Sequence, residues 1–415
     1  MMAEEKLGKN YPKMSFGSGD PNDIPDLIIA VNQPEKHGSG LDAYVSYNVV
    51  TKTTRTAFDA AEYSVRRRYQ DFLWLHTRLT ENFPLVIIPP LPEKQVLKRL
   101  DRFTPEFIHL RQLALEKFLV RVAKHEKLTN CDELKTFLTA KAWELTSAKK
   151  QTSGLINKVG GRIEQVKNYA SSIKIKNRNM DFVLMHDYVV NLSEKLTQID
   201  RISQRISKDQ SDLMDQQSEY APVFLNWANS EHRLADSLTA LSKCVDKNNK
   251  ALKELVESRD EKFGENLHEY VLFTESIKTT LRKRDRIQVQ HDQLVEQVAR
   301  KTENKRRMLE NPNAVTISTL FAKDTETNKQ TRIEKVDYRI DELNKQVDAS
   351  GEKMRDADDT VKAEYDKWNE TKRSDLKATF IDFADRNIVY FQKCLKAWQD
   401  ALSVLQECDP KSAKS

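Results

Sequence analysis

The chain has 415 residues, of which 32% are charged and 39% are apolar, and its formal net charge at pH 7 is +5. This length suits two domains, and the high charged fraction favours long helices with narrow apolar stripes over a second thick core. The four cysteines show neither C-x-x-C spacing nor nearby histidine clusters, so neither a disulfide framework nor a metal site is predicted.

Residues 1–25 are polar and interrupted by glycine and proline, so we expect a disordered N-terminal tail. Three short apolar or alternating runs follow, at residues 27–31, 43–50 and 63–68, with turn-prone segments between them. Runs of this kind are typical of antiparallel strands. We therefore predict a three-stranded antiparallel sheet at the start of the first domain.

Helical spacing replaces the strand pattern after residue 68. Phe72, Leu75 and Leu79 fall on one helix face, and this helix is expected to end near residue 82. Four prolines between residues 84 and 92 predict an extended loop, and a second amphipathic helix is predicted from Phe107 to Val122. Together these elements predict a small α+β domain over residues 26–143.

The linker at residues 150–180 concentrates positive charge, since residues 151–180 carry six Lys and Arg side chains against one Glu. We predict an amphipathic helix in this linker that lies at an anionic membrane surface. Packing of the same stripe on the helical domain is the alternative. The apolar residues predicted to insert into the membrane recur every three or four positions: Leu155, Val159, Ile163, Val166 and Ile173.

Nucleic acid is the other anionic partner that a basic linker could bind. The linker, however, contains a single aromatic side chain, Tyr169, and sequence-tolerant binding of single strands depends on aromatic rings that stack on bases. Its apolar stripe also suits a lipid boundary better. We therefore predict no nucleic-acid partner.

Residues 181–408 have heptad-like apolar spacing, which is typical of helices that pack on other helices. Three long helices are predicted, at about residues 180–245, 252–310 and 333–402, and Pro222 is expected to bend the first. Their length predicts an elongated bundle, followed by a short tail after residue 408. Two groups of cations in the second helix are candidates for lipid-facing patches, with a solvated helix surface as the alternative: Arg282, Lys283, Arg284 and Arg286, then Lys301, Lys305, Arg306 and Arg307.

Motifs of catalysis were sought in the whole sequence, which contains no H-E-x-x-H, no Walker lysine loop and no G-x-S-x-G. The neighbouring acids Asp356, Asp358 and Asp359 fall in a predicted long helix, where a solvated charged face is the ordinary interpretation. We therefore expect no enzyme activity, no catalytic residues and no cofactor.

One ordered set of residues in the α+β domain carries a specific signal: RRRYQDF at 66–72, PPLPEK at 89–94 and FIHLR at 107–111. Each piece alone has an ordinary interpretation, because arginines often end strands and prolines often mark turns. Their order is more specific. Arginine presents a bidentate fork to a phosphate, tyrosine a flat face to a ring, and a lysine on a rigid loop a point charge.

This set resembles the PX domain of the sorting nexins, whose pattern is R-R-x-F/Y-x-x-F, a proline loop with a trailing lysine, and a helix that bears an arginine. The resemblance covers roughly residues 25–143 and implies binding of phosphatidylinositol 3-phosphate. It implies that Arg68 grips the 3-phosphate and that Tyr69 underlies the inositol ring. Lys94 is implied to hold the 1-phosphate, and Arg111 to bond the 4- and 5-hydroxyls.

Apolar residues on the loop after the lysine are candidates to wedge between lipids, although Leu97 could equally belong to the core: Val96, Leu97 and Leu100. The rest of the chain resembles the PX-BAR subclass, closest to sorting nexins seven and thirty, in segments such as AWEL at 142–145, RISQRI at 201–206 and HEYVL at 268–272. The implied fold is an α+β PX domain, with a three-stranded antiparallel sheet plus helices, followed by an elongated, dimeric, all-α three-helix BAR domain.

The same resemblance implies a membrane-curvature-associated protein of endosomal sorting and recycling, with links to autophagy. The chain opens with no signal-peptide pattern, so we expect it to be cytoplasmic and peripheral on the cytosolic face of early endosomes. Its implied partner is a second copy or another PX-BAR sorting nexin of the sorting nexin four type. The alternative is a coiled-coil scaffold or cytoskeletal adaptor whose basic patch binds nucleic acid or lipid.

Overall fold

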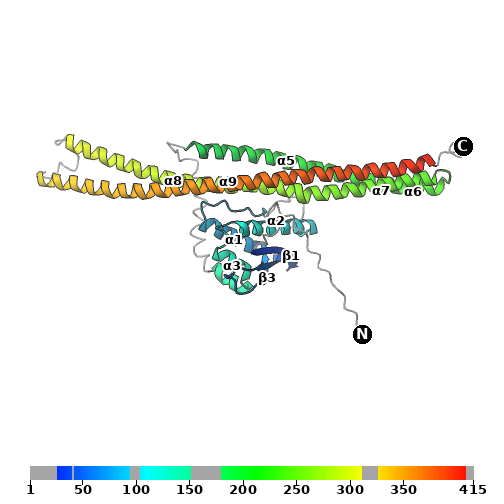
Figure 1. Ribbon diagram of the computed structural model, residues 1–415, viewed down its shortest axis with the longest axis horizontal. Helices are drawn as coiled ribbons and strands as arrows, with labels where there is room; N and C mark the ends of the chain where they lie inside the picture. The colour runs from blue at the N-terminus through cyan, green and yellow to red at the C-terminus, as the bar shows by residue number, and fades with distance from the viewer. Residues whose placement is uncertain (1–25, 40–41, 94–102, 151–178, 311–325, 408–415) are drawn as a thin grey trace, which may run out of the picture.

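The computed structural model describes residues 26–39, 42–93, 103–150, 179–310 and 326–407. A small α+β domain lies against one side of a long rod of helices (Figure 1). Among the described helices, none is both long and apolar enough to cross a membrane. The predicted fold class, an α+β domain followed by an all-helical region, is confirmed.

The sheet of the α+β domain has the strand order β1-β2-β3, and both neighbouring pairs are antiparallel. Strand β1 spans Leu27–His37, β2 spans Tyr44–Thr53 and β3 spans Glu62–Arg68. These bounds confirm the three predicted strands and extend the first two. Because side chains alternate between the two faces of a strand, one face of the sheet is apolar and packs on the helices. Its buried residues include Leu27, Ile29, Val31, Tyr47 and Val49.

Three helices complete the α+β domain: α1 (Tyr69–Asn82), α2 (Pro105–Lys124) and α3 (Asp132–Thr139). The first two match the predicted helices, whereas α3 has only eight residues and was not predicted. Helix α2 starts at a proline, whose fixed φ suits a first turn, and the Thr104 hydroxyl caps it by accepting a hydrogen bond from the Phe107 N–H at 3.3 Å. The core between helices and sheet includes Phe72, Leu75, Leu79, Leu115, Phe118, Leu119 and Phe137.

The described part of the rod consists of three helical runs, and each run is antiparallel to the next (Figure 1). Its last helix has 82 residues and is therefore about 120 Å long. The elements in chain order are α5 (Met180–Ser218), α6 (Tyr220–Ser230), α7 (Ala235–Ser258), the π-helix η2 (Arg259–Gly264), α8 (Glu265–Glu310) and α9 (Glu326–Glu407). The first run contains α5 and α6, the second contains α7, η2 and α8, and the third is α9.

The first helical run differs in length from its prediction. It is interrupted at Glu219, and Pro222 takes the third position of α6, where the missing N–H leaves no helical hydrogen bond unmade. The chain then reverses between Ser230 and Ala235, so the predicted end near residue 245 was wrong. The turn contains no glycine or proline, and apolar residues on both sides of it keep helical spacing. The sequence pattern therefore gave no sign that the chain reverses here.

The α+β domain and the rod share a packed interface. Ile87, from the loop after α1, is buried in the core of the rod rather than in the core of its own domain. An apolar side chain in this position ties the two domains together, because its exposure to water costs roughly 1.5–3 kcal/mol. Its neighbours in the rod core include Phe182, Val189, Leu196, Leu267, Tyr270, Ile277, Val361 and Trp368.

Candidate functional site

The three consecutive arginines at the end of β3 have different environments, since neighbouring side chains of a strand point to opposite faces. Arg67 is only 1% exposed, and its guanidinium donates hydrogen bonds to the carbonyls of Phe137, at 2.9 Å, and Ala140. The side chain of Arg66 is 38% exposed, and it pairs with Glu35 and donates a hydrogen bond to the Ser46 hydroxyl at 3.0 Å. The side chain of Arg68, by contrast, is 54% exposed. Arg67 is therefore a structural residue, and Arg68 presents its charge to solvent.

The backbone of Arg68 is held at the start of α1. Its N–H donates a hydrogen bond of 2.8 Å to the Asp71 carboxylate, and the Arg68 Nε lies 3.9 Å from the other oxygen of that carboxylate. Lys149, from a helical segment over residues 142–150, also contacts Asp71. Asp71 thus fixes the main chain of Arg68, while the guanidinium remains accessible to an anion.

Tyr69, Arg111 and the proline loop meet beside Arg68. The Tyr69 hydroxyl donates a hydrogen bond of 2.5 Å to the Pro92 carbonyl, and the Arg111 guanidinium donates one of 3.2 Å to the Glu93 carbonyl. The guanidinium carbon of Arg111 lies 4.6 Å from the centre of the Tyr69 ring, within cation–π range. The three separate motifs in the sequence are therefore one structural unit.

Burial sets the protonation of this unit. It raises the pKa of the Tyr69 phenol, which stays neutral and can donate a hydrogen bond to the Pro92 carbonyl. It lowers the pKa of Arg111 from its ordinary value, but a guanidinium remains charged at neutral pH. A second ring, that of Phe107, lies 4.2 Å from the Arg111 guanidinium carbon. Arg111 is thus a preorganised cation whose position is fixed by two rings and a carbonyl.

This arrangement suits recognition of an anionic group with a polar ring. Arg68 offers an accessible guanidinium, which forms strong, directional hydrogen bonds to phosphate oxygens. Tyr69 and Arg111 supply a rigid aromatic and cationic surface beside it. Among the described residues, no group of three or more His, Cys, Asp and Glu side chains is placed to hold a metal ion. The chemistry available here is binding of an anion.

Several residues predicted for membrane contact lie outside the described residues. They are the loop residues Lys94, Val96, Leu97 and Leu100, together with Leu155, Val159, Ile163, Val166 and Ile173 of the linker.

The structure corrects the first of the two predicted basic patches on the rod. Arg284 is only 2% exposed, and its guanidinium forms two hydrogen bonds to Asp358, at 2.6 and 3.1 Å, and lies 4.0 Å from the centre of the Phe182 ring. Lys283 donates a hydrogen bond of 2.9 Å to the Thr80 carbonyl of the α+β domain. The prediction that these two residues face lipid was wrong, because both charges are used inside the molecule.

The second predicted patch lies near the end of α8, and its charges are partly neutralised. Arg306 pairs with Glu303 and Glu310 at 2.8 and 2.6 Å, and Arg307 pairs with Glu303 at 2.9 Å. Lys305 pairs with Asp337 of α9 at 2.5 Å. The guanidinium groups are more than half exposed, so these are solvated surface ion pairs of small individual energy.

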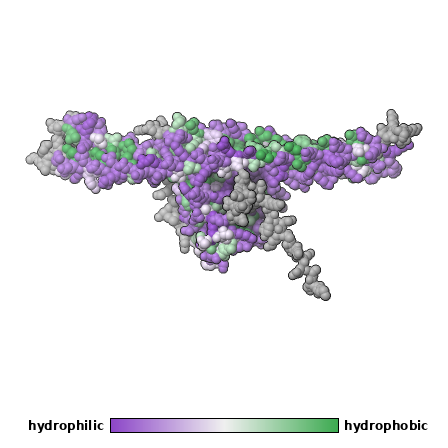
Figure 2. All heavy atoms as spheres, in the orientation of Figure 1, coloured by the Kyte–Doolittle hydropathy of each residue, from purple (hydrophilic) through white to green (hydrophobic). Residues whose placement is uncertain are grey.

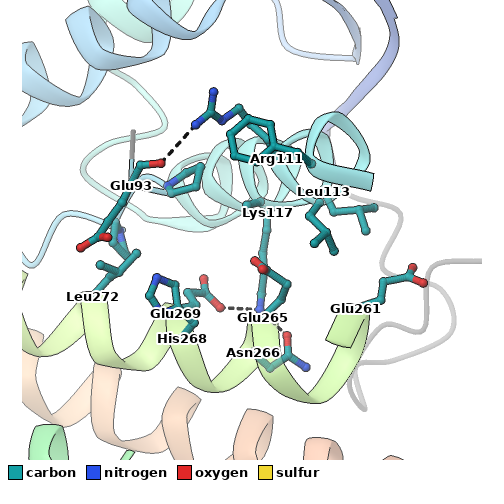
Figure 3. A pocket seen from close by; sticks show the side chains of 15 residues that line it. Glu93, Arg111, Leu113, Lys117, Glu261, Glu265, Asn266, His268, Glu269 and Leu272 are labelled. Atoms are coloured by element: carbon teal, nitrogen blue, oxygen red, sulfur yellow. Dashed lines mark hydrogen bonds and ion pairs between the residues drawn. The ribbon is translucent and has the colours of Figure 1, made fainter. Parts of the chain in front are cut away.

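A cavity of about 120 Å³ separates α2 from α8 next to Arg111 (Figure 3). Figure 3 shows Arg111 pointing away from α8 and Lys117 pointing toward it, so the two side chains occupy opposite sides of α2. Burial raises the pKa of Glu265 on the α8 side to about 6, which the nearby His268 and Lys117 only partly offset. The lining side chains include Glu93, Arg111, Lys117, Glu265, His268 and Glu269.

A network of ion pairs joins α2 to the rod beside this cavity. Arg121 donates to Glu269 of α8 at 2.9 Å and to Asp375 of α9 at 2.7 Å, and Lys117 also pairs with Glu269. The Tyr270 hydroxyl donates a further 2.7 Å hydrogen bond to Asp375. Burial by itself raises the pKa of Glu269, but Lys117 and Arg121 lower it below its ordinary value. The α+β domain is therefore fixed on the rod by charge as well as by Ile87.

Sequence reasoning did not find these interface residues. Lys117 and Arg121 belong to a helix for which the sequence indicated only an apolar face, and their partners lie about 150 and 250 residues further along the chain. The one available signal was local: Leu85 to Ile88 is a run of four large apolar residues in a loop, more than the core of a small domain needs.

Two family models match the chain. The PX domain model matches residues 55–141, which contain Arg68, Tyr69 and Arg111. The model described as "Vps5 C terminal like" matches residues 152–404, more than half of the chain.

Known proteins are similar over most of this length. Human sorting nexin-7 is 37% identical over 386 residues, which are 92% of this chain and 90% of that protein. Sorting nexin-30 of Danio rerio is 39% identical over 383 residues, 92% of this chain and 79% of that protein. The solved cryo-EM structure of the SNX-BAR Mvp1 tetramer has the same fold, with a TM-score of 0.66 at 18% identity, and covers 90% of this chain and 99% of that one.

Proteins with this pair of domains are non-enzymatic scaffolds that bind membranes, and the pair implies membrane-associated trafficking. The expectations of a PX domain, a following BAR-like region and a non-catalytic function are thereby confirmed. With both family models in order and more than a third of its residues shared with sorting nexin-7, the chain belongs to the sorting nexin family, in its PX-BAR subclass.

Proposed function

We propose that this sorting nexin binds phosphatidylinositol 3-phosphate on the cytosolic face of early endosomes and acts there in protein sorting and recycling, with a contribution to autophagy. Arg68 binds the 3-phosphate, and Tyr69 lies under the inositol ring. Lys94 holds the 1-phosphate, and Arg111 bonds the 4- and 5-hydroxyls. The family resemblance is the source of these individual roles.

The observation that carries the proposal is the convergence of three motifs at one place. Arg68 is the last residue of β3, Arg111 lies on α2, and the proline loop binds both Tyr69 and Arg111 through its carbonyls. Arg68 is the cation of this group with a half-exposed side chain, and Arg111 is oriented by the Tyr69 ring at 4.6 Å. An accessible guanidinium beside a rigid aromatic surface supports recognition of a phosphorylated ring.

Apolar anchors complete the membrane contact in this proposal. Val96, Leu97 and Leu100 follow the proline loop directly, and the linker carries Leu155, Val159, Ile163, Val166 and Ile173 on one predicted helix face. Insertion of such side chains adds apolar burial to the phosphate contacts, and the basic residues of the linker add attraction to anionic lipid.

Pairing with a second BAR domain is the other part of the proposal, either a second copy or a sorting nexin of the sorting nexin four type. Large apolar side chains gather along the rod over α5 and α9 (Figure 2). An apolar stripe of this size on a soluble rod favours burial against another helical surface. The exposed residues of the stripe include Ile199, Ile202, Ile206, Phe380, Ile388, Phe391, Leu395, Trp398 and Leu402.

Binding of the full-length chain to vesicles tests the lipid assignment. Vesicles with about 5% phosphatidylinositol 3-phosphate are compared with vesicles that hold the same amount of phosphatidylinositol 4-phosphate or of phosphatidylserine. Wild type is expected to prefer the first, and Arg68→Ala to bind those vesicles about 10- to 100-fold more weakly, the loss typical of one charge-assisted contact.

Arg66→Ala is the matched control, because it removes the same charge from the same strand. The Arg66 side chain already pairs with Glu35 at 2.8 Å, so its loss is expected to weaken vesicle binding by no more than about threefold. Equal losses in both variants, or no preference for the 3-phosphate in wild type, would exclude the proposed headgroup site.

A further inference from the structure

Residues 85–93 form an extended segment that runs from the core of the rod to the proposed headgroup site. Val86 and Ile88 are buried in the core of the PX domain, whereas Ile87, between them, is buried in the core of the rod. A few residues later, the carbonyls of Pro92 and Glu93 accept the hydrogen bonds of Tyr69 and Arg111. One short stretch of chain thus touches both places.

The rod fixes this segment through its main chain as well as through Ile87. The Ile87 N–H donates a hydrogen bond of 3.4 Å to Glu364 of α9, and the Thr280 hydroxyl of α8 donates one of 3.3 Å to the Val86 carbonyl. Glu364 is only 5% exposed, and its same oxygen lies 2.9 Å from Nε2 of His125 at the end of α2. A single buried carboxylate on the rod therefore holds both the segment and α2.

Helix α2 is a second connection between the same two places. Its N-terminal half carries Arg111, which contacts Tyr69, and its C-terminal half carries Lys117 and Arg121, which pair with Glu269 of the rod. Figure 3 shows Arg111 and Lys117 on opposite sides of this helix. Since a helix transmits displacement along its length, movement of the rod contacts shifts Arg111 as well.

We infer that Ile87 and Glu364 are positioning residues for the headgroup site, and that headgroup binding and docking of the PX domain on the rod stabilise each other. The inference rests on the proposed phosphoinositide function and deepens it. Neither residue touches the headgroup. They act through the loop carbonyls that orient Tyr69 and Arg111, and by thermodynamic linkage a ligand that orders this loop tightens the docking contact by the same factor.

The test uses the full-length chain and a soluble, short-chain phosphatidylinositol 3-phosphate, so that vesicle curvature and avidity do not enter. Ile87→Ala is expected to weaken binding by about fivefold or more, the lower range of couplings between sites. Ile87→Val, which keeps most of the side chain, is expected to bind as wild type does. Calorimetry gives the dissociation constants.

Leu196→Ala is the matched control. It removes a comparable side chain from the same core cluster, but from α5, which lies on the side of the rod away from the PX domain (Figure 1). It is expected to lower the melting temperature while leaving the headgroup affinity within twofold of wild type. Glu364→Gln is the second variant, in case Ile87→Ala folds poorly, because it keeps the volume and removes the charge opposite His125. It too is expected to weaken headgroup binding.

Hydrogen exchange measures the opposite effect, that of lipid binding on docking of the PX domain. The soluble lipid is expected to slow amide exchange in α8 near residues 265–281 of wild type, at the docking surface, and to have no such effect in Ile87→Ala. If Ile87→Ala and Glu364→Gln bind the lipid as wild type does, and the lipid does not change amide exchange in α8, the proposed coupling is wrong while the proposed headgroup site is unaffected. If Leu196→Ala loses as much affinity as Ile87→Ala, general rod stability is responsible and the positioning role is wrong. If wild type does not bind the lipid, the inference falls together with the proposed function.

Discussion

Nη2 of Arg121 lies 2.7 Å from the Asp375 carboxylate, which pairs the second helix of the PX domain with the last helix of the rod. The same guanidinium reaches Glu269 of α8, so a single side chain bridges two helices of the rod. Arg121 and Glu269 are both largely buried. Such a pair stabilises a structure mainly by preventing an unpaired buried charge, because removal of one partner leaves the other desolvated.

Arg121→Leu is therefore expected to lower the free energy of unfolding by about 3 kcal/mol or more, since Glu269 stays buried with only Lys117 beside it. Urea unfolding at pH 7 measures the change. Lys367→Ala breaks another ion pair across the same interface, the one between Lys367 and Glu126. Both side chains of this pair are more than half exposed, so the variant is expected to lose less than about 1 kcal/mol of stability. Similar costs for the two variants would contradict the buried-charge explanation.

Arg67 and Arg68 are neighbours with opposite expected effects. Arg67→Ala removes the charge-assisted hydrogen bond to the Phe137 carbonyl and is expected to destabilise the protein by about 1.5–3 kcal/mol. Arg68→Ala is expected to change stability by less than about 0.5 kcal/mol, because its side chain is half exposed. Thermal unfolding of the two variants without lipid checks both. A larger loss in Arg68→Ala would show that the two environments are exchanged in solution.

The apolar stripe over α5 and α9 predicts an oligomer. Replacement of both Phe391 and Trp398 with glutamate is expected to yield a monomer in size-exclusion chromatography with light scattering, because two charges cannot be buried unpaired in a helical interface. Tyr338→Glu is the control. Tyr338 is an equally exposed aromatic on α9, far along the helix from the stripe, and its variant is expected to keep the mass of wild type. A monomeric wild type, alone and with a sorting nexin partner, would contradict the prediction.

Glu265 predicts a pH dependence of stability. Its pKa in the folded protein is raised to about 6 from an ordinary value near 4.5, so between these values the folded state binds more protons than the unfolded state. Stability contributed by the protonated carboxyl is present below pH 4.5 and is lost as the pH rises through 6. The charged groups around it are Lys117 and His268, which favour its ionised form, and Asp200 and Glu269, which oppose it.

Glu265→Gln has a neutral side chain at every pH, so it removes the contribution of this carboxyl to the pH dependence of stability. Relative to wild type, the variant is expected to gain about 1–2 kcal/mol between pH 4.5 and 7. Urea unfolding at half-unit pH steps measures the difference. Parallel curves for the two proteins would mean that Glu265 titrates normally.

The linker prediction remains to be tested by two substitutions on its apolar stripe. Val159→Asp together with Val166→Asp is expected to abolish tubulation of vesicles while leaving the melting temperature without lipid unchanged. The reason is that, in this prediction, the stripe contacts the membrane and not the rod. A drop in melting temperature without lipid would instead favour packing of the stripe on the rod.

The strands, α1, α2 and the long helices could all be predicted from the sequence, because each depends on local spacing of apolar residues. The headgroup residues could be nominated for a similar reason, since Arg68 and Tyr69 are adjacent and the proline loop is a local signal. Physical proximity of Tyr69 and Arg111 was implied by family resemblance rather than by any spacing in the chain. The end of the first rod helix was misplaced, because no residue in its turn breaks a helix.

Interactions between distant parts of the chain could not be predicted. Arg284 was assigned to a lipid-facing patch because three other cations lie within four residues of it, yet Asp358 and Phe182 surround it in the structure. Charge density along a sequence does not reveal which side of a helix faces a neighbour. For the same reason the destination of Ile87, inside the other domain, has no signature in the sequence.

The π-helix η2 determines which face of α8 meets the PX domain. At its start, Arg259 and Asp260 contact Gln210 and Ser207 of α5. After it, Glu269 contacts α2. A π-turn accommodates one residue more than an α-helical turn, and each residue of an α-helix turns the following part by about 100°. Deletion of one residue within η2 would restore a regular helix and turn the docking face of α8 by about a quarter turn away from the PX domain. The π-turn therefore sets the angular position at which Glu269 meets α2.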